Sequence, residues 1–229
     1  MTNTSPITLD QLFRNNKNLP HQLAAITELE QDIRLNGYDV AMRRSRPWFS
    51  VWSQAGKQSN PLATPYQSQR DNYRDANRTC FSSSCAMLLM TLKPGAIHSD
   101  DDYIKTVFSI GDTTDASVQL KALAKYGIKA RFETGGNRDL IKRQIDAGKP
   151  VPAGFLHHGP VTAPSGGGHW LCIIGYDAKG YWVNDPWGEM NITAGTYGST
   201  VGSKLHYSYA NWEPRWMVDG PSTGWCIIA

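Results

Sequence analysis

The sequence predicts an α+β protein in which a group of helices comes first and an antiparallel sheet follows. Between residues 80 and 147, apolar side chains recur mainly at helical spacing. From residue 151 onward the apolar runs are short and bounded by Gly, Pro or Asp, which is typical of strands. Helices that are separated in this way from an antiparallel sheet define the α+β class.

Three helices are expected in the main domain, at Cys80–Thr91, Ala116–Tyr126 and Arg138–Ala147, the last closed by Gly148. The expected strands are Ile128–Glu133, Val151–Leu156, a hairpin from His169 to Asp185, Arg215–Val218 and Gly224–Ile228.

Residues 1–60 are predicted to be an extension that packs on a catalytic domain at residues 61–229. A helix is expected from Pro20, which suits a first helical position, to Gly37, a stop signal. The following arm, residues 43–52, mixes arginines with Trp48, Phe49 and Trp52. These aromatics either anchor the arm on the core or form a binding surface for sugars or a partner.

Composition narrows the function classes. The chain of 229 residues is 40% hydrophobic and 19% charged, with a formal net charge of +3. This small excess suits anionic surfaces such as the bacterial cell wall but does not indicate nucleic acid binding. No apolar run approaches the ~18–20 residues that span a bilayer, and residues 1–10 lack a secretory pattern. We therefore expect a monomer made in the cytoplasm, without a membrane span, which other machinery exports if it acts on the wall.

Cys80 is the candidate nucleophile among four cysteines. It opens a predicted helix, where free N–H groups and the positive dipole end favour a thiolate and can stabilise an oxyanion. Cys85 is expected to be a small core residue, and reduced thiols are the default. We expect no cofactor and no metal, because no ligand pair has a recognised spacing and the adjacent His157 and His158 would face opposite ways in a strand.

His169 and Asp185 lie at the two ends of the predicted hairpin. A histidine that acts as a base needs a partner of this kind to fix its tautomer and stabilise its positive form. Alternation puts their side chains on opposite faces when the turn is a plain two-residue one. A three-residue loop ending in Gly180 at positive φ, with a bulge, would restore a common face.

A glutamine on the loop before the nucleophile helix can donate its side-chain N–H to the same oxyanion. Gln69 is our first choice and Gln67 the second. Two interpretations stay open for residues 165–168, Ser-Gly-Gly-Gly: a wall that lets the substrate backbone approach His169, or an ordinary surface loop.

Taken together, these motifs resemble the papain-like cysteine peptidases, closest to the branch of bacteriocin-processing, double-glycine leader peptidases and related phage and bacterial domains. The resemblance rests on Gln69-Arg70-Asp71-Asn72 before Thr79-Cys80, on Gly168-His169, and on Asp185-Pro186-Trp187-Gly188, which matches Asn-Ser-Trp-Gly of papain. The chain departs from the family in the longer interval between Gln69 and Cys80 and in Phe81-Ser82 after the cysteine.

The resemblance implies a papain-like fold with a nucleophile helix packed on the sheet. It also implies Cys80 as nucleophile, His169 as base and acid, Asp185 as orienter, Gln69 as oxyanion donor and Trp187 as a shield over the His–Asp pair. The expected function is a peptidoglycan-cleaving endopeptidase or amidase of the endolysin kind. Two alternatives remain: a protein-directed cysteine peptidase that processes a leader or a phage structural protein, and a non-catalytic binding module on the same frame.

Overall fold

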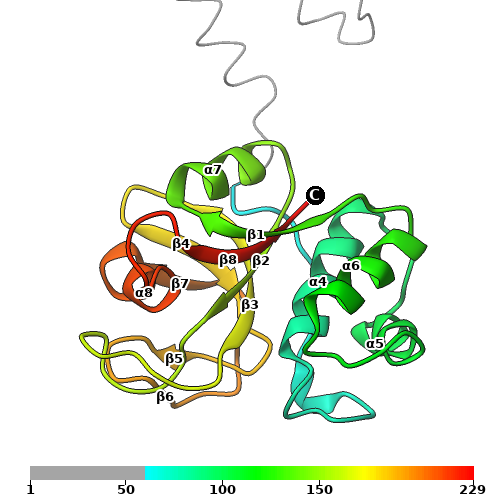
Figure 1. The fold of residues 1–229 in the computed structure, drawn as a ribbon, viewed down its shortest axis with the longest axis horizontal. Coiled ribbons are helices and arrows are strands. Elements are labelled where there is room, and N and C mark those ends of the chain that lie inside the picture. The colour runs from blue at the N-terminus through cyan, green and yellow to red at the C-terminus, as the bar shows by residue number, and fades with distance from the viewer. Residues whose placement is uncertain (1–59) are drawn as a thin grey trace, which may run out of the picture. The chain divides into compact units, whose positions relative to one another are not determined.

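The computed structural model describes residues 60–229, and Figure 1 gives the element labels used below. The predicted helix and the aromatic arm of residues 1–59 lie outside the described residues. Within residues 60–229 there are five α-helices and a six-stranded sheet. The predicted α+β class is confirmed.

The sheet is antiparallel throughout and has the strand order β1-β8-β2-β3-β4-β7. Its strands are β1 (Arg131–Gly136), β2 (Val151–Phe155), β3 (His169–Tyr176), β4 (Gly180–Asn184), β7 (Leu205–Ser208) and β8 (Gly224–Ile228). A separate two-stranded sheet pairs β5 (Met190–Asn191) with β6 (Thr196–Tyr197). The strands predicted at 151–156, 169–185 and 224–228 are therefore present.

Helices α4 (Cys80–Leu92), α5 (Asp100–Phe108) and α6 (Ala116–Lys125) gather beside the sheet, as Figure 1 shows. Helices α7 (Arg138–Asp146) and α8 (Tyr209–Trp216) pack against the sheet elsewhere, and a 3-10 turn, η1 (Gln69–Asp71), precedes α4. None of these helices is long and apolar enough to cross a membrane, a finding that covers residues 60–229 alone.

The two faces of β3 serve two hydrophobic clusters. Leu171 and Ile173 belong to a core with residues of α7 and α8, including Trp212. Cys172 and Ile174, on the other face, contact Met87 of α4. Because successive strand residues point to opposite faces, one strand joins helix α4 to the rest of the sheet.

One predicted strand is wrong. Arg215–Val218 was expected to be extended, but Arg215 and Trp216 end helix α8, which has Pro214 inside it. Tyr209, Trp212 and Trp216 are buried at helical spacing, and this periodicity outweighs the proline. The first strand is also displaced from its predicted range, Ile128–Glu133, to Arg131–Gly136.

Helix α5 and strand β7 were not predicted. The signals for α5 were available, because Ser99 precedes three aspartates in the first turn and Tyr103, Ile104 and Val107 share its buried side. Strand β7 has only four residues and pairs with β4, a contact that no local pattern specifies.

A stacked pair of rings joins α4 to β3. Phe81 follows Cys80 and Trp170 follows His169, and their ring centroids are 3.5 Å apart with planes 6° from parallel. Gly154 pairs with Trp170 across the sheet, and a Cβ there would collide with the indole. The stack therefore holds the start of α4 beside the start of β3.

Replacing Phe81 by alanine should lower the free energy of unfolding by about 3–5 kcal/mol, because it opens a cavity under the indole of Trp170. Urea denaturation followed by circular dichroism measures the change. Val201→Ala, at a side chain that is 66% exposed, is the control and should alter stability by less than about 0.5 kcal/mol. A loss below about 1 kcal/mol for Phe81→Ala would contradict the structural role of the stack.

Candidate active site

His169 and Asp185 are in direct contact: Nε2 of His169 lies 2.7 Å from Oδ1 of Asp185. Strand pairing explains how they share a face. Near the turn Gly175 pairs with Trp182, but from Ile173 onward the register shifts by one residue. Continuing the shifted register places Asp185 opposite Leu171, on the face to which His169 also points. Without this β-bulge the two side chains would lie on opposite faces.

The predicted role of Gly180 in this geometry is wrong. Gly180 is not among the residues with positive φ, and the bulge lies in β3 rather than at the turn. The turn is instead fixed by Asp177, whose Oδ1 accepts hydrogen bonds from the N–H groups of Lys179 and Gly180. Gly180 is needed for another reason: a Cβ there would collide with the carbonyl of Tyr207 on β7.

The His–Asp pair is sealed from water. His169 is 5% exposed and Asp185 is fully buried. Burial by itself lowers the pKa of His169, but the negative charge of Asp185, followed by Cys80, outweighs it and raises the pKa to about 10. The imidazole is therefore held in its positive form over the neutral pH range.

Cys80 is the first residue of α4 and keeps part of its surface exposed. It lies close enough to His169 to contribute, after Asp185, to the raised pKa of that ring. Because Nε2 of His169 is bound to Asp185, Nδ1 is the nitrogen left for the thiol. The other three cysteines are buried free thiols, so Cys85 is the core residue that was expected.

The buried carboxylate of Asp185 has further partners. The backbone N–H of Trp187 donates to Oδ1 at 3.0 Å, and the Tyr197 hydroxyl lies 3.5 Å from Oδ2. The Tyr197 ring also meets the His169 ring edge-on, with centroids 5.8 Å apart. Tyr197 was missed at the sequence level, because the short β5–β6 sheet that carries it shows no clear strand pattern.

Trp187, the expected shield, is half-buried and stacked by the guanidinium of Arg70, whose Cζ lies 4.5 Å from the ring centroid. Arg70 follows Gln69 on η1, so this contact joins the loop before the nucleophile helix to the segment after Asp185. Together with its N–H bond to Asp185, it fixes Trp187 next to the pair.

The structure distinguishes the two candidate glutamines. Gln69 is buried; its N–H donates to the carbonyl of Pro186, and its Nε2 donates to Ala76, four residues before Cys80. Gln69 thus joins the residue after Asp185 to the loop that leads to Cys80. Gln67 instead caps α5, because its Oε1 accepts the Asp100 N–H and its Nε2 donates to the carbonyl of Tyr66.

A cluster of buried polar side chains supports the first turn of α4. The hydroxyl of Ser83 lies 2.5 Å from Oδ2 of Asp100, and Asn72 bridges Asp100 to Thr79, the residue before Cys80. Burial raises the pKa of Asp100 to about 6, although the hydrogen bond from Ser83 acts in the opposite direction. These contacts fix the loop that enters the helix, where the Thr79 side chain makes no capping bond.

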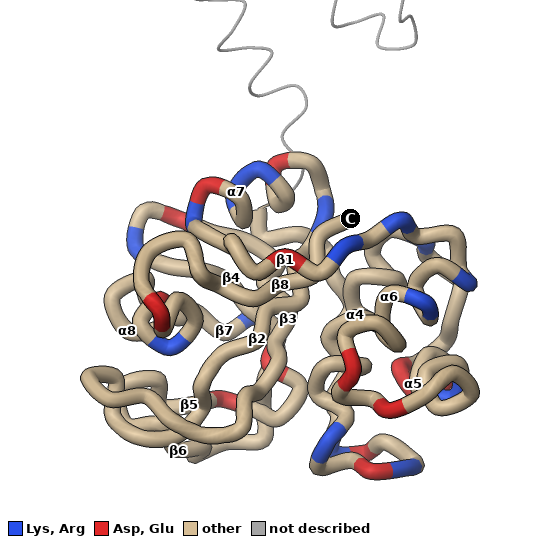
Figure 2. Tube along the Cα trace, in the orientation of Figure 1, with Lys and Arg blue, Asp and Glu red and all other residues tan. Residues whose placement is uncertain are grey.

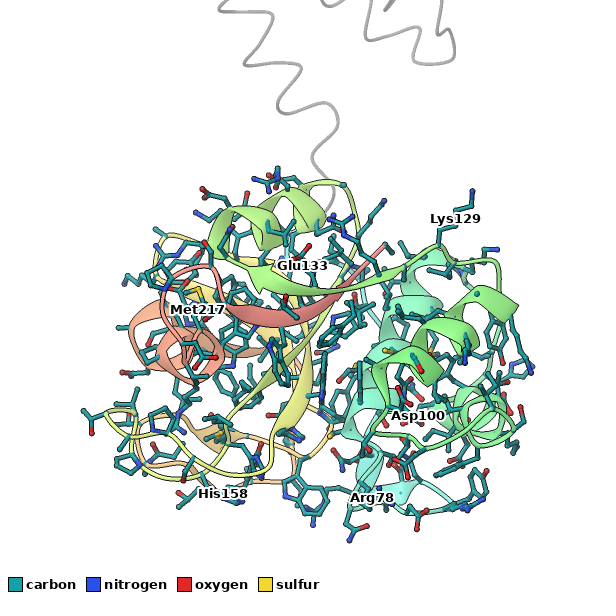
Figure 3. The ribbon with its side chains drawn as sticks, in the orientation of Figure 1. Arg78, Asp100, Lys129, Glu133, His158 and Met217 are labelled. Carbon is teal, nitrogen blue, oxygen red and sulfur yellow. The ribbon has the colours of Figure 1, made fainter. Side chains whose placement is uncertain are left out.

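His157 and His158 do not face opposite ways as predicted, because they lie beyond the end of β2 at Phe155, where His158 forms an isolated bridge with Ser165. Their ring centroids are 3.9 Å apart, and the His157 ring lies 5.6 Å from that of His169. Buried Arg215 holds this segment by donating to the carbonyls of Leu156, His158 and Gly159. As Figure 3 shows, His158 and Arg78 lie at the same end of the domain, on the sheet side and the helix side.

Comparison with solved structures places the fold. A putative C39-like peptidase from Bacillus anthracis superposes with a TM-score of 0.51 at 16% identity, over 73% of this chain and 95% of that one. A double glycine motif protease from an AMS/PCAT transporter, in complex with the leader peptide, superposes with a TM-score of 0.47 at 16% identity, over 75% of this chain and 94% of that one. The peptidase domain of Streptococcus ComA superposes with a TM-score of 0.39 at 14% identity, over 66% of this chain and 90% of that one.

No curated protein matches the chain. The pattern of the Peptidase_C39 like family, however, matches residues 61–213, about two thirds of the sequence. This match covers the nucleophile helix, the His–Asp hairpin and most of the sheet. The fold is papain-like, and the chain belongs to the C39-like family of cysteine peptidases.

Proposed function

We propose that the protein is a cysteine-dependent amide-bond hydrolase that uses Cys80, His169 and Asp185 as its triad and cleaves the peptide part of the bacterial cell wall. The observation that carries the proposal is the position of the His169 ring, which contacts the buried carboxylate of Asp185 and lies near the partly exposed Cys80. A nucleophile, a base and an orienting group in hydrogen-bond reach define this chemistry.

In the proposed reaction, Sγ of Cys80 attacks the amide carbonyl carbon and forms a C–S bond, while the carbonyl oxygen becomes an oxyanion. His169 gives its proton to the amide nitrogen, and the C–N bond breaks. The neutral imidazole then takes a proton from water, which attacks the thioester and releases the acid and the Cys80 sulfur. Asp185 stabilises the imidazolium at each stage in which His169 is charged.

The oxyanion has two kinds of donor. The free N–H groups at the start of α4, including that of Cys80, point out of the first turn of the helix. Gln69 gives one N–H of its amide group to Ala76. In this proposal the second N–H donates to the substrate oxygen.

The wall as substrate is supported by the modest positive charge of the chain, +3, which suits an anionic surface. Within this proposal the protein is made in the cytoplasm and reaches the wall by other machinery. A protein-directed peptidase remains the rival for the same triad.

Incubating the protein with purified peptidoglycan, followed by mass analysis of the soluble fragments, tests the function. We expect the wild type to release peptides with new amino termini and Cys80→Ala to release none, because the nucleophile is lost. Cleavage retained in Cys80→Ala would remove Cys80 from the mechanism. If the wall stays intact while cell proteins are cleaved in an iodoacetamide-sensitive way, the protein-directed rival is favoured.

Asp185→Asn should move the alkaline limb of the pH–activity profile downward. The charge of Asp185 outweighs the effect of burial and raises the pKa of His169 to about 10. Activity of the wild type should therefore persist until the pH rises through this value. Without the charge, the limb should fall by about one to three pH units. Initial rates from pH 5 to 11 measure it, and an unchanged limb would argue that Asp185 does not set the charge of His169.

Gln69→Glu should lower kcat by about 10²–10³-fold, because it keeps the shape of the side chain but replaces the donor by an acceptor. Gln67→Glu is the matched control two residues away and should keep near-wild-type kcat, since its partner is the start of α5. Circular dichroism checks that both variants fold. Equal losses in the two variants would refute the assignment of the oxyanion donor to Gln69.

A further inference from the structure

A second imidazole, His157, lies next to the proposed acid–base residue and has no part in the reaction described above. Its ring centroid is 5.6 Å from that of His169 and 6.4 Å from that of Tyr197. It comes two residues after Phe155, which pairs with His169 across the sheet. His157 therefore adjoins His169 on the sheet side of the site, while Cys80 belongs to the helix side.

The two nitrogens of His157 are in different surroundings. Nδ1 is buried and has no hydrogen-bond partner within residues 60–229. Nε2 is not among the buried unpartnered atoms, and the residue as a whole is only half-buried. If the proton were on Nδ1, a buried N–H donor would have no acceptor, and the full free-energy cost of its desolvation would remain. If the proton is on Nε2, the buried Nδ1 is only a weak acceptor without a donor, which costs less. The proton of neutral His157 therefore belongs on Nε2, at the accessible edge.

The surroundings also keep His157 neutral. Burial chiefly, and then the electrostatic effects of His169, His158 and Arg215, lower the pKa of His157 to about 4. The carboxylate of Asp185, the acid of the site, is bonded to His169. His157 is thus a fixed hydrogen-bond donor over the range in which His169 stays charged.

The walls around His157 suit a peptide main chain. Residues 156–168 and 190–203 contain no Asp, Glu, Lys or Arg, and Figure 2 shows the region of β5 and β6 with almost no charged positions. A Cβ atom built at Gly167 or Gly168 would meet nothing within 4 Å, so open space lies directly before His169. The Arg215 bonds hold the segment from Leu156 to Gly159 in place.

We infer that His157 donates its Nε2–H to a main-chain carbonyl in the leaving part of the substrate, and that this bond favours peptide leaving groups over leaving groups without such a carbonyl. The leaving part is assigned because His169 protonates the departing amine and His157 adjoins His169 on the side away from α4. This inference rests on the proposed cysteine peptidase function and names how that site recognises its substrate.

Two substrates with the same acyl part test the inference. One is an internally quenched peptide that spans the bond cleaved in the wall, and the other is the aminomethylcoumarin amide of its acyl half. His157→Phe should lower kcat/KM about tenfold on the peptide, the worth of one hydrogen bond, and leave the coumarin amide unchanged. His157→Gln, which keeps an N–H donor, should restore most of the loss.

Equal losses on both substrates, or no loss on the peptide, would overturn the inference while leaving the proposed function intact. If the wild type cleaves neither substrate, the proposed function itself fails and the inference falls with it. His98→Gln, at an exposed histidine before α5, is the control and should change neither rate.

A measurement without substrate checks the same claim. Nitrogen-15 NMR of the histidine rings should find His157 neutral, with its proton on Nε2, from pH 5.5 to 8. Titration of His157 within this range, or a proton on Nδ1, would overturn the inference. Assignment is made by comparison with His157→Gln.

Discussion

The one-residue bulge in β3 is the constraint on which the candidate site depends. His169 and Asp185 belong to the two strands of one hairpin, and strand alternation would separate them if the ladder were regular. The shift in register between Ile173 and Gly175 brings both side chains to one face, where they meet at 2.7 Å. The carbonyl of Ile174 at the bulge accepts the N–H of Leu62, so the segment leading into the domain stabilises the irregular strand.

A fully buried carboxylate is stable only when charge and hydrogen bonds compensate it. Asp185 meets this requirement with the His169 imidazolium, the Trp187 N–H and the Tyr197 hydroxyl. The same compensation keeps His169 charged against its own burial. The ring stack of Phe81 on Trp170 then sets the start of α4, which carries Cys80, beside this charged pair. The packing contact and the charged site thus use neighbouring residues: Phe81 follows Cys80 in α4, and Trp170 follows His169 in β3.

Much of this could be predicted from the sequence. The helix that begins at Cys80, the hairpin from His169 to Asp185 and the buried strands have strong local patterns, and the structure contains all three. The bulge could not be located, because its position depends on how β4 also pairs with β7 and on the contact of Leu62. Pro214 concealed the helical spacing of α8, and the aspartates that begin α5 were overlooked although their pattern is clear.

Long-range contacts explain what else was missed. Tyr197 and His157 approach His169 from segments with weak local patterns, and Arg215 holds one of those segments from a helix about 57 residues away. Nothing local in the sequence marks these residues as neighbours. Gln69 and Gln67 are likewise indistinguishable by type and spacing, whereas the structure gives one to the loop before Cys80 and the other to the start of α5.

The central claim is that Cys80 and His169 work as one unit, and the pH dependence of Cys80 alkylation by iodoacetamide tests it most directly. Among the four thiols, only Cys80 is accessible, so mass mapping can follow it alone. The account predicts rapid alkylation of Cys80 at pH 6 in the wild type and a rate at least about tenfold lower in His169→Ala, since a neighbouring imidazolium favours the reactive thiolate. Equal rates in the two proteins would contradict the account.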